Sequence, residues 1–175
     1  SFLATYDKYP YWVQKVDAVR PFILKKYGGV YIDLDTYPKH PIDNIFRLYE
    51  ISPQIEVLLG EGTLSSYSNW FMVSRKGSTF WDVVIAEMKK PLMFARITKH
   101  MEVMWSTGPY LINNCVKKYD QTRIKLLGKD ILTNCSICDT DSECYKKSLY
   151  VVDQHAASWH SSDSEFMNRV YCNLL

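Results

Sequence analysis

The sequence contains no apolar run of the roughly 18 residues that a membrane-spanning helix needs, and its first residues lack the basic start and apolar stretch of a signal peptide. It also lacks a long block of charges of one sign, because 21 Lys and Arg residues and 19 Asp and Glu residues are mixed along the chain. This balance favours neither a nucleic-acid groove nor a polybasic membrane patch. We therefore expect the chain as given to be soluble, to bind no nucleic acid, and to associate with a membrane only through segments outside it.

The cysteine pattern lacks the second closely spaced pair of a zinc site. Three of the five cysteines cluster as Cys135-x2-Cys138-x5-Cys144, while Cys115 and Cys172 stand apart. This spacing favours one or two disulfides or free thiols over a metal knuckle. The odd count leaves the redox compartment open.

The composition predicts one domain over residues 1–175. The chain is 47% hydrophobic and 14% aromatic, which is enough to bury one substantial core but not two. No internal repeat or low-complexity segment divides it. Large aromatic side chains usually lie in such a core, and this places Trp12, Trp70, Trp81 and Trp105 there.

One long helix is predicted over residues 11–26, with apolar residues at helical spacing and the pair Gly28-Gly29 as its stop. The apolar positions are Val13, Val16, Val19, Ile23 and Leu24. Pro21 lies inside this pattern and predicts a kink or an interruption.

The rest of the chain alternates irregularly between strand and helix patterns, which predicts an α/β fold with a mixed sheet. The predicted strands cover residues 30–35, 55–59, 70–73, 124–127 and 149–152. The predicted helices cover residues 78–89, opened by a Ser cap, and 110–118, opened by Thr-Gly-Pro, and residues 129–148 read as a surface excursion.

Asp33-Leu34-Asp35 follows the apolar start of the first predicted strand. Two carboxylates at positions i and i+2 of an extended segment point to the same side, where both can approach one divalent cation and its bound phosphate. Asp17 and Arg20, three residues apart on the preceding helix, share a helical face. An Asp-x-Asp pair alone is common in solvated loops, and an Asp–Arg pair alone is usually a surface salt bridge.

The order of several motifs carries more information than the pair. Residues 2–7, Val16-Asp17-Ala18-Val19-Arg20 and the run from Tyr27-Gly28-Gly29 to Asp35 closely resemble the sugar-binding region of DXD glycosyltransferases. The likeness extends through Asn69, the Thr107-Gly108-Pro109 turn and the segment from residue 155 to residue 163. The nearest branch is similar to the inositol phosphoceramide mannosyltransferases. Yeast initiation-type α-mannosyltransferases and clostridial glucosylating toxins share the pattern more distantly.

This resemblance implies a GT-A-like fold, retaining transfer of a hexose from a nucleotide-diphosphate sugar to a glycan or lipid hydroxyl, and Mn²⁺ or Mg²⁺ as cofactor. It implies catalytic roles for Asp33, Asp35, Arg20 and Asn69, and donor binding by Asp17, Arg20, Asp33, Asn69, Ser158 and Trp159. The implied metal ligands are Asp35 and Asp33, with His155 or His160 as a further one.

Several alternatives stay open at this stage. GDP-mannose and UDP-hexoses both suit these residues as donors, and a eukaryotic relative would work in the Golgi or secretory-pathway lumen. Members of the family begin with a nucleotide-binding strand and helix upstream, so we expect this chain to be a segment of a longer GT-A domain. An aspartate-dependent phosphohydrolase also opens on a strand and Asp-x-Asp, and a non-catalytic sugar- or metal-binding remnant of a transferase is the third interpretation.

Overall fold

The computed structural model describes residues 1–48, 52–62, 67–92, 98–128, 131–132, 138, 150–153 and 160–172. Its centre is a four-stranded mixed sheet in the order β1-β4-β3-β5. The strands are β1 (Gly29–Ile32), β3 (Val57–Glu61), β4 (Tyr67–Ser74) and β5 (Ile124–Leu127). β3 and β5 are parallel, and the other pairings are antiparallel. A second, two-stranded antiparallel sheet joins β2 (Thr36–Pro38) to β6 (Val151–Asp153).

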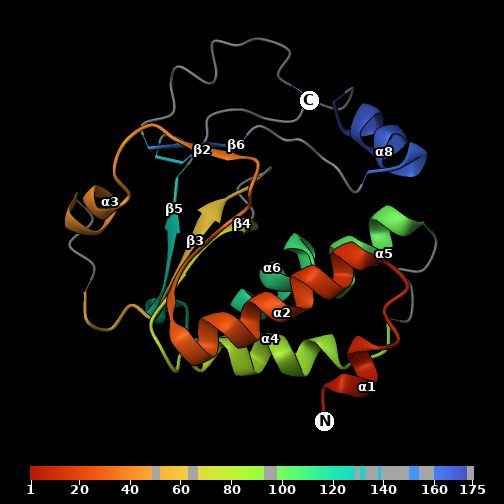
Figure 1. The fold of residues 1–175 in the computed structure, drawn as a ribbon, viewed down its shortest axis with the longest axis horizontal. Coiled ribbons are helices and arrows are strands. Elements are labelled where there is room, and N and C mark those ends of the chain that lie inside the picture. Colours follow the sequence, from red (N-terminus) through yellow and green to blue (C-terminus); the bar gives the residue numbers. More distant parts are fainter. Residues whose placement is uncertain are drawn as a thin grey trace.

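Helices α2, α4 and α6 lie together on one side of the central sheet, with α5 and α8 beyond them (Figure 1). The helical elements are α1 (Leu3–Tyr6), α2 (Trp12–Tyr27), α3 (Asp43–Leu48), α4 (Phe80–Met88), α5 (Lys99–Ser106), α6 (Pro109–Lys118), the 3₁₀ turn η2 (Gln121–Arg123) and α8 (Ser162–Cys172). Within the described ranges, no helix is both long enough and apolar enough to span a bilayer.

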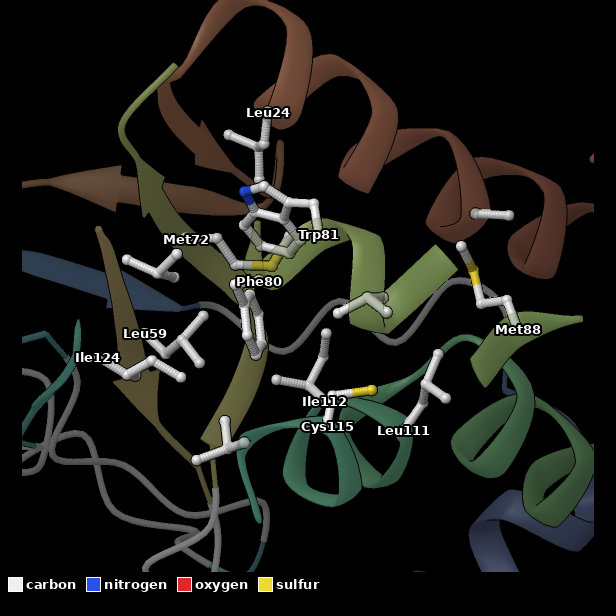
Figure 2. Packing of buried hydrophobic residues seen from close by; sticks show 14 residues of the cluster. Leu24, Leu59, Met72, Phe80, Trp81, Met88, Leu111, Ile112, Cys115 and Ile124 are labelled. Atoms are coloured by element: carbon white, nitrogen blue, oxygen red, sulfur yellow. The ribbon is translucent and has the colours of Figure 1, made fainter. Parts of the chain in front are cut away.

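Strand alternation divides the buried apolar residues between the two faces of the sheet. On β3, Val57 and Leu59 join the cluster under α2, α4 and α6, whereas Leu58 joins the cluster on the other face. Figure 2 shows the first cluster, in which side chains from the three helices meet those of the strands. Trp81 is fully buried there, and its indole N–H donates to Ser74 Oγ at 2.7 Å. This paired polar atom lets the largest side chain of the core be buried without an unsatisfied donor.

The predicted elements exist with shifted ends. β5 has the predicted bounds, β4 is longer than predicted, and α4 and α6 fall within or close to their predicted ranges. The interruption predicted at Pro21 is wrong, because α2 runs on to Tyr27 as one helix. Proline removes one backbone donor, and packing of the surrounding turns against the core compensates: Pro21 and Leu24 are both buried.

The buried face of α2 differs from the face that the apolar periodicity predicts. Val16, Val19 and Ile23 are 53%, 37% and 49% exposed, whereas Gln14 is fully buried and Asp17 is 6% exposed. Gln14 can be buried because its side-chain amide donates to Ser106 Oγ of α5 at 2.8 Å. Polar residues of α2 therefore share its buried face with Ala18 and Leu24, and an apolar stripe faces outward.

The tryptophans that the sequence places in the core are divided between buried and exposed positions. Trp70 and Trp81 lie in the core as predicted, but Trp12 and Trp105 are 80% and 45% exposed. The core assignment of these last two is therefore wrong.

The described cysteines form one disulfide and one free thiol. Cys138 pairs with Cys172 at the end of α8, and burial raises the pKa of the Cys115 thiol to about 12. Cys115 is thus an unreactive part of the core. Cys135, Cys144 and most of the predicted excursion at 129–148 lie outside the described residues.

Gly28 ends α2 at φ 68°, and a Cβ built on it would lie 2.6 Å from Lys76 N. Gly77 has a similar φ of 80°, but a Cβ there meets nothing within 4 Å. We expect Gly77→Ala to cost about 1 kcal/mol through its φ alone. Gly28→Ala should cost at least about twice as much, because the backbone of residues 74–76 must also move. Urea unfolding of the two variants measures this difference, and equal losses would contradict the packing described here.

Candidate active site

The Asp33-Leu34-Asp35 segment is a turn and not the end of a strand. The Asp33 N–H still donates to Trp70 O at 2.9 Å, but Thr36 N–H donates back to Asp33 O at 3.2 Å and closes the turn between β1 and β2. The predicted strand over residues 30–35 is therefore wrong beyond Ile32. Leu34 is fully exposed, and all three residues of the segment line one cavity. Both aspartates thus border this cavity from a turn, and the same-side placement of their carboxylates stays a prediction.

This cavity has a volume of about 870 Å³ and brings together residues from distant parts of the chain. Its walls come from the start of α2, the turn after β1, β4, and the connection between α5 and α6. The residues that the sequence predicts for donor binding and catalysis and that line it are Asp17, Arg20, Asp33, Asp35 and Asn69. The Gly108-Pro109 turn, part of the same resemblance, lines it as well.

Arg20 connects the elements that form the cavity. Its Nη1 lies 2.9 Å from Asp17 Oδ1, and its Nη2 lies 3.1 Å from Asp33 Oδ1. Nη1 also donates to the backbone carbonyl of Asn69 at 3.2 Å. The residue is only 9% exposed, and among the described residues its buried Nε has no hydrogen-bond partner. Its guanidinium group supplies a positive charge at the cavity wall, which can attract an anionic group of a ligand.

Tyr31 belongs to the site, but the sequence motifs did not identify it as a site residue. Its hydroxyl donates to Asp33 Oδ1 at 2.6 Å, and its ring lies 4.4 Å from the Arg20 guanidinium carbon. Burial, as the main cause, raises the pKa of Tyr31, so the phenol stays protonated and keeps donating. The strand period of two, which places residue 31 on the same side as residue 33, could have identified it.

Asp17 is a buried carboxyl whose charge is only partly compensated. Burial raises its pKa to about 7, and the Asp33 charge acts in the same direction. The Arg20 cation and a hydrogen bond from Thr107 Oγ1 at 3.4 Å oppose this shift. The cavity therefore contains a carboxyl that can change protonation near neutral pH.

The structure does not test all of the remaining predicted residues. His155, Ser158 and Trp159 lie outside the described residues. His160 is not part of the cavity lining and lies against His100 of α5, with the ring centroids 6.0 Å apart. No group of three or more His, Cys, Asp and Glu side chains converges within the described part of the chain. The assignment of histidine ligands stays a prediction.

The chemistry of the donor set nevertheless fits a divalent cation. Asp33 and Asp35 present carboxylate oxygens to the same cavity, and Mg²⁺ and Mn²⁺ prefer such ligands while retaining open positions for phosphate oxygens. Arg20 and Tyr31 both bind Asp33 Oδ1 and so orient this carboxylate.

Residues 1–52 match the family model described as "Glycosyltransferase sugar-binding region containing DXD motif". This segment contains Asp17, Arg20, Asp33 and Asp35. The chain is related to the DXD glycosyltransferases. The resemblance inferred from the ordered motifs is thereby confirmed.

Curated relatives match over nearly the whole chain. The sequence is 29% identical over 168 residues to inositol phosphoceramide mannosyltransferase 3 of Schizosaccharomyces pombe, covering 95% of this chain and 43% of that protein. It is 28% identical over 174 residues to mannosyl phosphorylinositol ceramide synthase CSH1 of Saccharomyces cerevisiae, covering 99% and 43%. The chain thus spans less than half the length of these relatives.

A solved structure supports the fold class. The PaToxG glycosyltransferase matches with a TM-score of 0.50 at 17% identity, over 67% of this chain and 40% of that one. At this identity the likeness concerns the fold alone. Together with the mixed sheet, it confirms the predicted GT-A-like α/β class.

The raised pKa of Asp17 predicts a pH-dependent stability. Between about pH 4 and pH 7 the folded protein binds a proton at Asp17 that the unfolded chain has lost, so stability falls as pH rises through this range. Asp17→Asn removes the titrating carboxyl and with it this dependence of stability on pH. The unfolding free energy of wild type should fall between pH 5 and pH 8, whereas that of the variant should not. The difference between variant and wild type should therefore shift by about 1 kcal/mol or more in favour of the variant over this range.

Urea unfolding at several pH values tests this expectation. Asp7→Asn, at an exposed position, serves as the control and should follow wild type throughout. Parallel pH profiles for Asp17→Asn and wild type would show that the carboxyl is not protonated in the folded state.

Proposed function

We propose that this chain carries the donor-binding and catalytic centre of a retaining, metal-dependent glycosyltransferase that moves a hexose from a nucleotide-diphosphate sugar to a hydroxyl group. The observation that carries this proposal is the convergence of Asp17, Arg20, Asp33 and Asp35 on one cavity, within the segment that matches the DXD family.

The cavity residues divide the work as follows. Asp17 and Asn69 bind hydroxyl groups of the donor hexose, and the Arg20 guanidinium attracts the donor phosphate by its positive charge. Tyr31 and Arg20 hold Asp33 in place for the donor. Because these groups are preorganised by one another, they need little rearrangement as charge develops in the transition state.

In the transfer step, the bond between the anomeric carbon and the phosphate oxygen breaks, and its electron pair stays on the nucleoside diphosphate. The acceptor oxygen forms the new bond on the same face and gives its proton to the leaving phosphate. Arg20 stabilises the developing negative charge. This front-face route requires no protein nucleophile.

Asp35 and Asp33 would hold the Mn²⁺ or Mg²⁺ ion, which as a Lewis acid neutralises charge on the leaving diphosphate. His155 or His160 would add a further ligand, and Ser158 and Trp159 would close over the diphosphate. The roles of the two histidines and of Ser158 and Trp159 rest on the family resemblance.

The names of the relatives support a mannosyl donor and a lipid acceptor. We therefore place GDP-mannose first as donor, with UDP-hexoses as alternatives, and a glycolipid before a glycan as acceptor. A eukaryotic protein of this kind would act in the lumen of the Golgi or secretory pathway. No contact among the described residues favours the phosphohydrolase interpretation, and none favours the non-catalytic interpretation.

We also propose that residues 1–175 are part of a longer transferase domain. In the β1–β4 register, Asp33 and Trp70 form a hydrogen-bonded pair, so the backbone groups of Val30 and Ile32 point away from β4. β1 is the last strand on this side among the described residues. Next to it lies the exposed apolar stripe of α2. An unpaired strand edge beside an apolar surface favours a further strand at this position.

Asp35→Asn tests the catalytic proposal, because it removes a negative charge at nearly constant size. We expect metal-dependent transfer to fall at least about 100-fold, with an unchanged melting temperature, since the residue lies in a turn. Asp43→Asn, at the start of α3, is the matched control and should retain full activity. Transfer by Asp35→Asn at near wild-type rate would refute the metal-binding role.

Binding measurements separate the alternatives. Calorimetry with Mn²⁺ and a panel of nucleotide sugars should detect donor binding that disappears when EDTA is added. Release of inorganic phosphate from phosphate monoesters without use of nucleotide sugars would instead favour the hydrolase.

Hydrogen exchange tests the open strand edge. In the longer protein, the amides of Val30 and Ile32 should exchange as slowly as that of Tyr31, which β4 already protects. Exchange of Val30 and Ile32 at loop-like rates, with Tyr31 protected, would mean that no further strand pairs with β1.

A further inference from the structure

We propose that Thr107 is a positioning residue for the donor sugar, because its hydroxyl group holds the Asp17 carboxylate in one orientation, and that Gln14 keeps Thr107 in place through Ser106. This inference rests on the proposed function, in which Asp17 binds hydroxyl groups of the donor hexose. It concerns three side chains that support the cavity without lining it.

The carboxylate of Asp17 is held at both oxygens, and each contact comes from a different element. Arg20 Nη1, one turn further along α2, lies 2.9 Å from Oδ1. Thr107 Oγ1, at the end of α5, donates to Oδ2 at 3.4 Å. A carboxylate oxygen can accept two hydrogen bonds. The two contacts therefore fix the plane of the carboxylate and still allow it to accept from a ligand hydroxyl.

The contact from Thr107 is long, so it depends on how closely the end of α5 lies against α2. A second link, one turn earlier on α2, sets this separation: the Gln14 side-chain amide donates to Ser106 Oγ at 2.8 Å. Gln14 is fully buried, and its amide oxygen accepts from the Tyr11 N–H at 3.2 Å. Both ends of this amide are thus fixed, and it holds the residue next to Thr107.

The turn that carries Thr107 moves together with one wall of the cavity. The carbonyl of Val103 accepts from the backbone N–H groups of Thr107 at 3.2 Å and Gly108 at 2.9 Å. A Cβ built on Gly108 would lie 2.9 Å from Met104 Cα, so the turn is closely packed. Val103, Met104 and Gly108 all line the cavity. The link to α2 therefore places Thr107 and this wall as one unit.

A positioning role and a purely structural role differ in which ligands they affect. If Thr107 only supported the fold, its loss would weaken the binding of all ligands alike. If it acts through Asp17, its loss weakens the binding of the hexose alone, because Asp17 is assigned to the hexose and not to the diphosphate. A comparison of a nucleotide sugar with its free nucleoside diphosphate therefore separates the two roles.

The test is calorimetric titration of the full-length protein, with Mn²⁺ present, using GDP-mannose against GDP and UDP-glucose against UDP. For the nucleotide sugar that wild type binds, we expect Thr107→Val to raise the Kd roughly tenfold and to leave the Kd of the free diphosphate unchanged. Thr107→Ser keeps the hydroxyl and should restore most of the affinity. Thr122→Val is the matched control: it removes an exposed hydroxyl that also donates to an aspartate, Asp120 Oδ1 at 2.6 Å, and should bind as wild type does.

A double-mutant cycle checks that Thr107 acts through Asp17. In the Asp17→Asn background, Thr107→Val should change the Kd of the nucleotide sugar by less than about twofold. Gln14→Met and Ser106→Ala each break the second link and should raise the same Kd in an otherwise wild-type background.

Equal effects of Thr107→Val on the nucleotide sugar and on the free diphosphate would overturn the positioning role, as would a full effect in the Asp17→Asn background. Unchanged Kd values for Gln14→Met and Ser106→Ala would overturn the part assigned to Gln14. If wild type binds neither nucleotide sugar, the transferase function is refuted, whereas normal donor binding with no effect of Thr107→Val refutes only the positioning role.

Discussion

The site depends on the buried guanidinium of Arg20, which lies between two carboxylates. Asp17 lies on the same helix, so that pair is local to α2. The pair with Asp33, which follows β1, joins α2 to the turn that carries Asp35. Removing Arg20 would leave two carboxylates close together in a poorly solvated cavity, which is far more costly than the loss of an exposed pair. The same contacts that close this part of the fold also orient the groups assigned to the donor.

The core explains why this arrangement can be rigid. The cluster under α2, α4 and α6 contains the fully buried Phe80 and Trp81, and the strand alternation of β3 joins it to the second cluster across the sheet. Two buried polar side chains are paired here, Trp81 with Ser74 and Gln14 with Ser106. The cavity is thus built on elements that dense packing keeps in place.

The outer side of α2 has the opposite character. Its apolar stripe is exposed, and α2 contacts β1, whose outer edge has no strand partner among the described residues. Globular domains usually cover both kinds of feature. The chain spans less than half the length of the curated relatives reported above.

Local pattern alone predicted much of the architecture. The stop of α2 at Gly28, the Pro109 start of α6 and the strand β5 follow from residue types whose backbone preferences act over a few positions. The ordered motifs around Asp17, Arg20 and Asp33 identified the family and the residues that line the cavity. These inferences succeeded because the types and the order of residues can be compared directly between sequences.

The sequence by itself determined the elements, the family and the set of charged residues available for catalysis. Only the tertiary structure decided which side of α2 is buried, because apolar periodicity cannot anticipate that Gln14 and Asp17 find partners on α5 and on the loop that follows it. It also decided that Asp33 and Asp35 reach one cavity through a turn, that Tyr31 and Arg20 orient Asp33, and that Trp12 lines the same cavity. Each of these depends on contacts between residues far apart in the chain or on a local hydrogen bond that spacing does not encode.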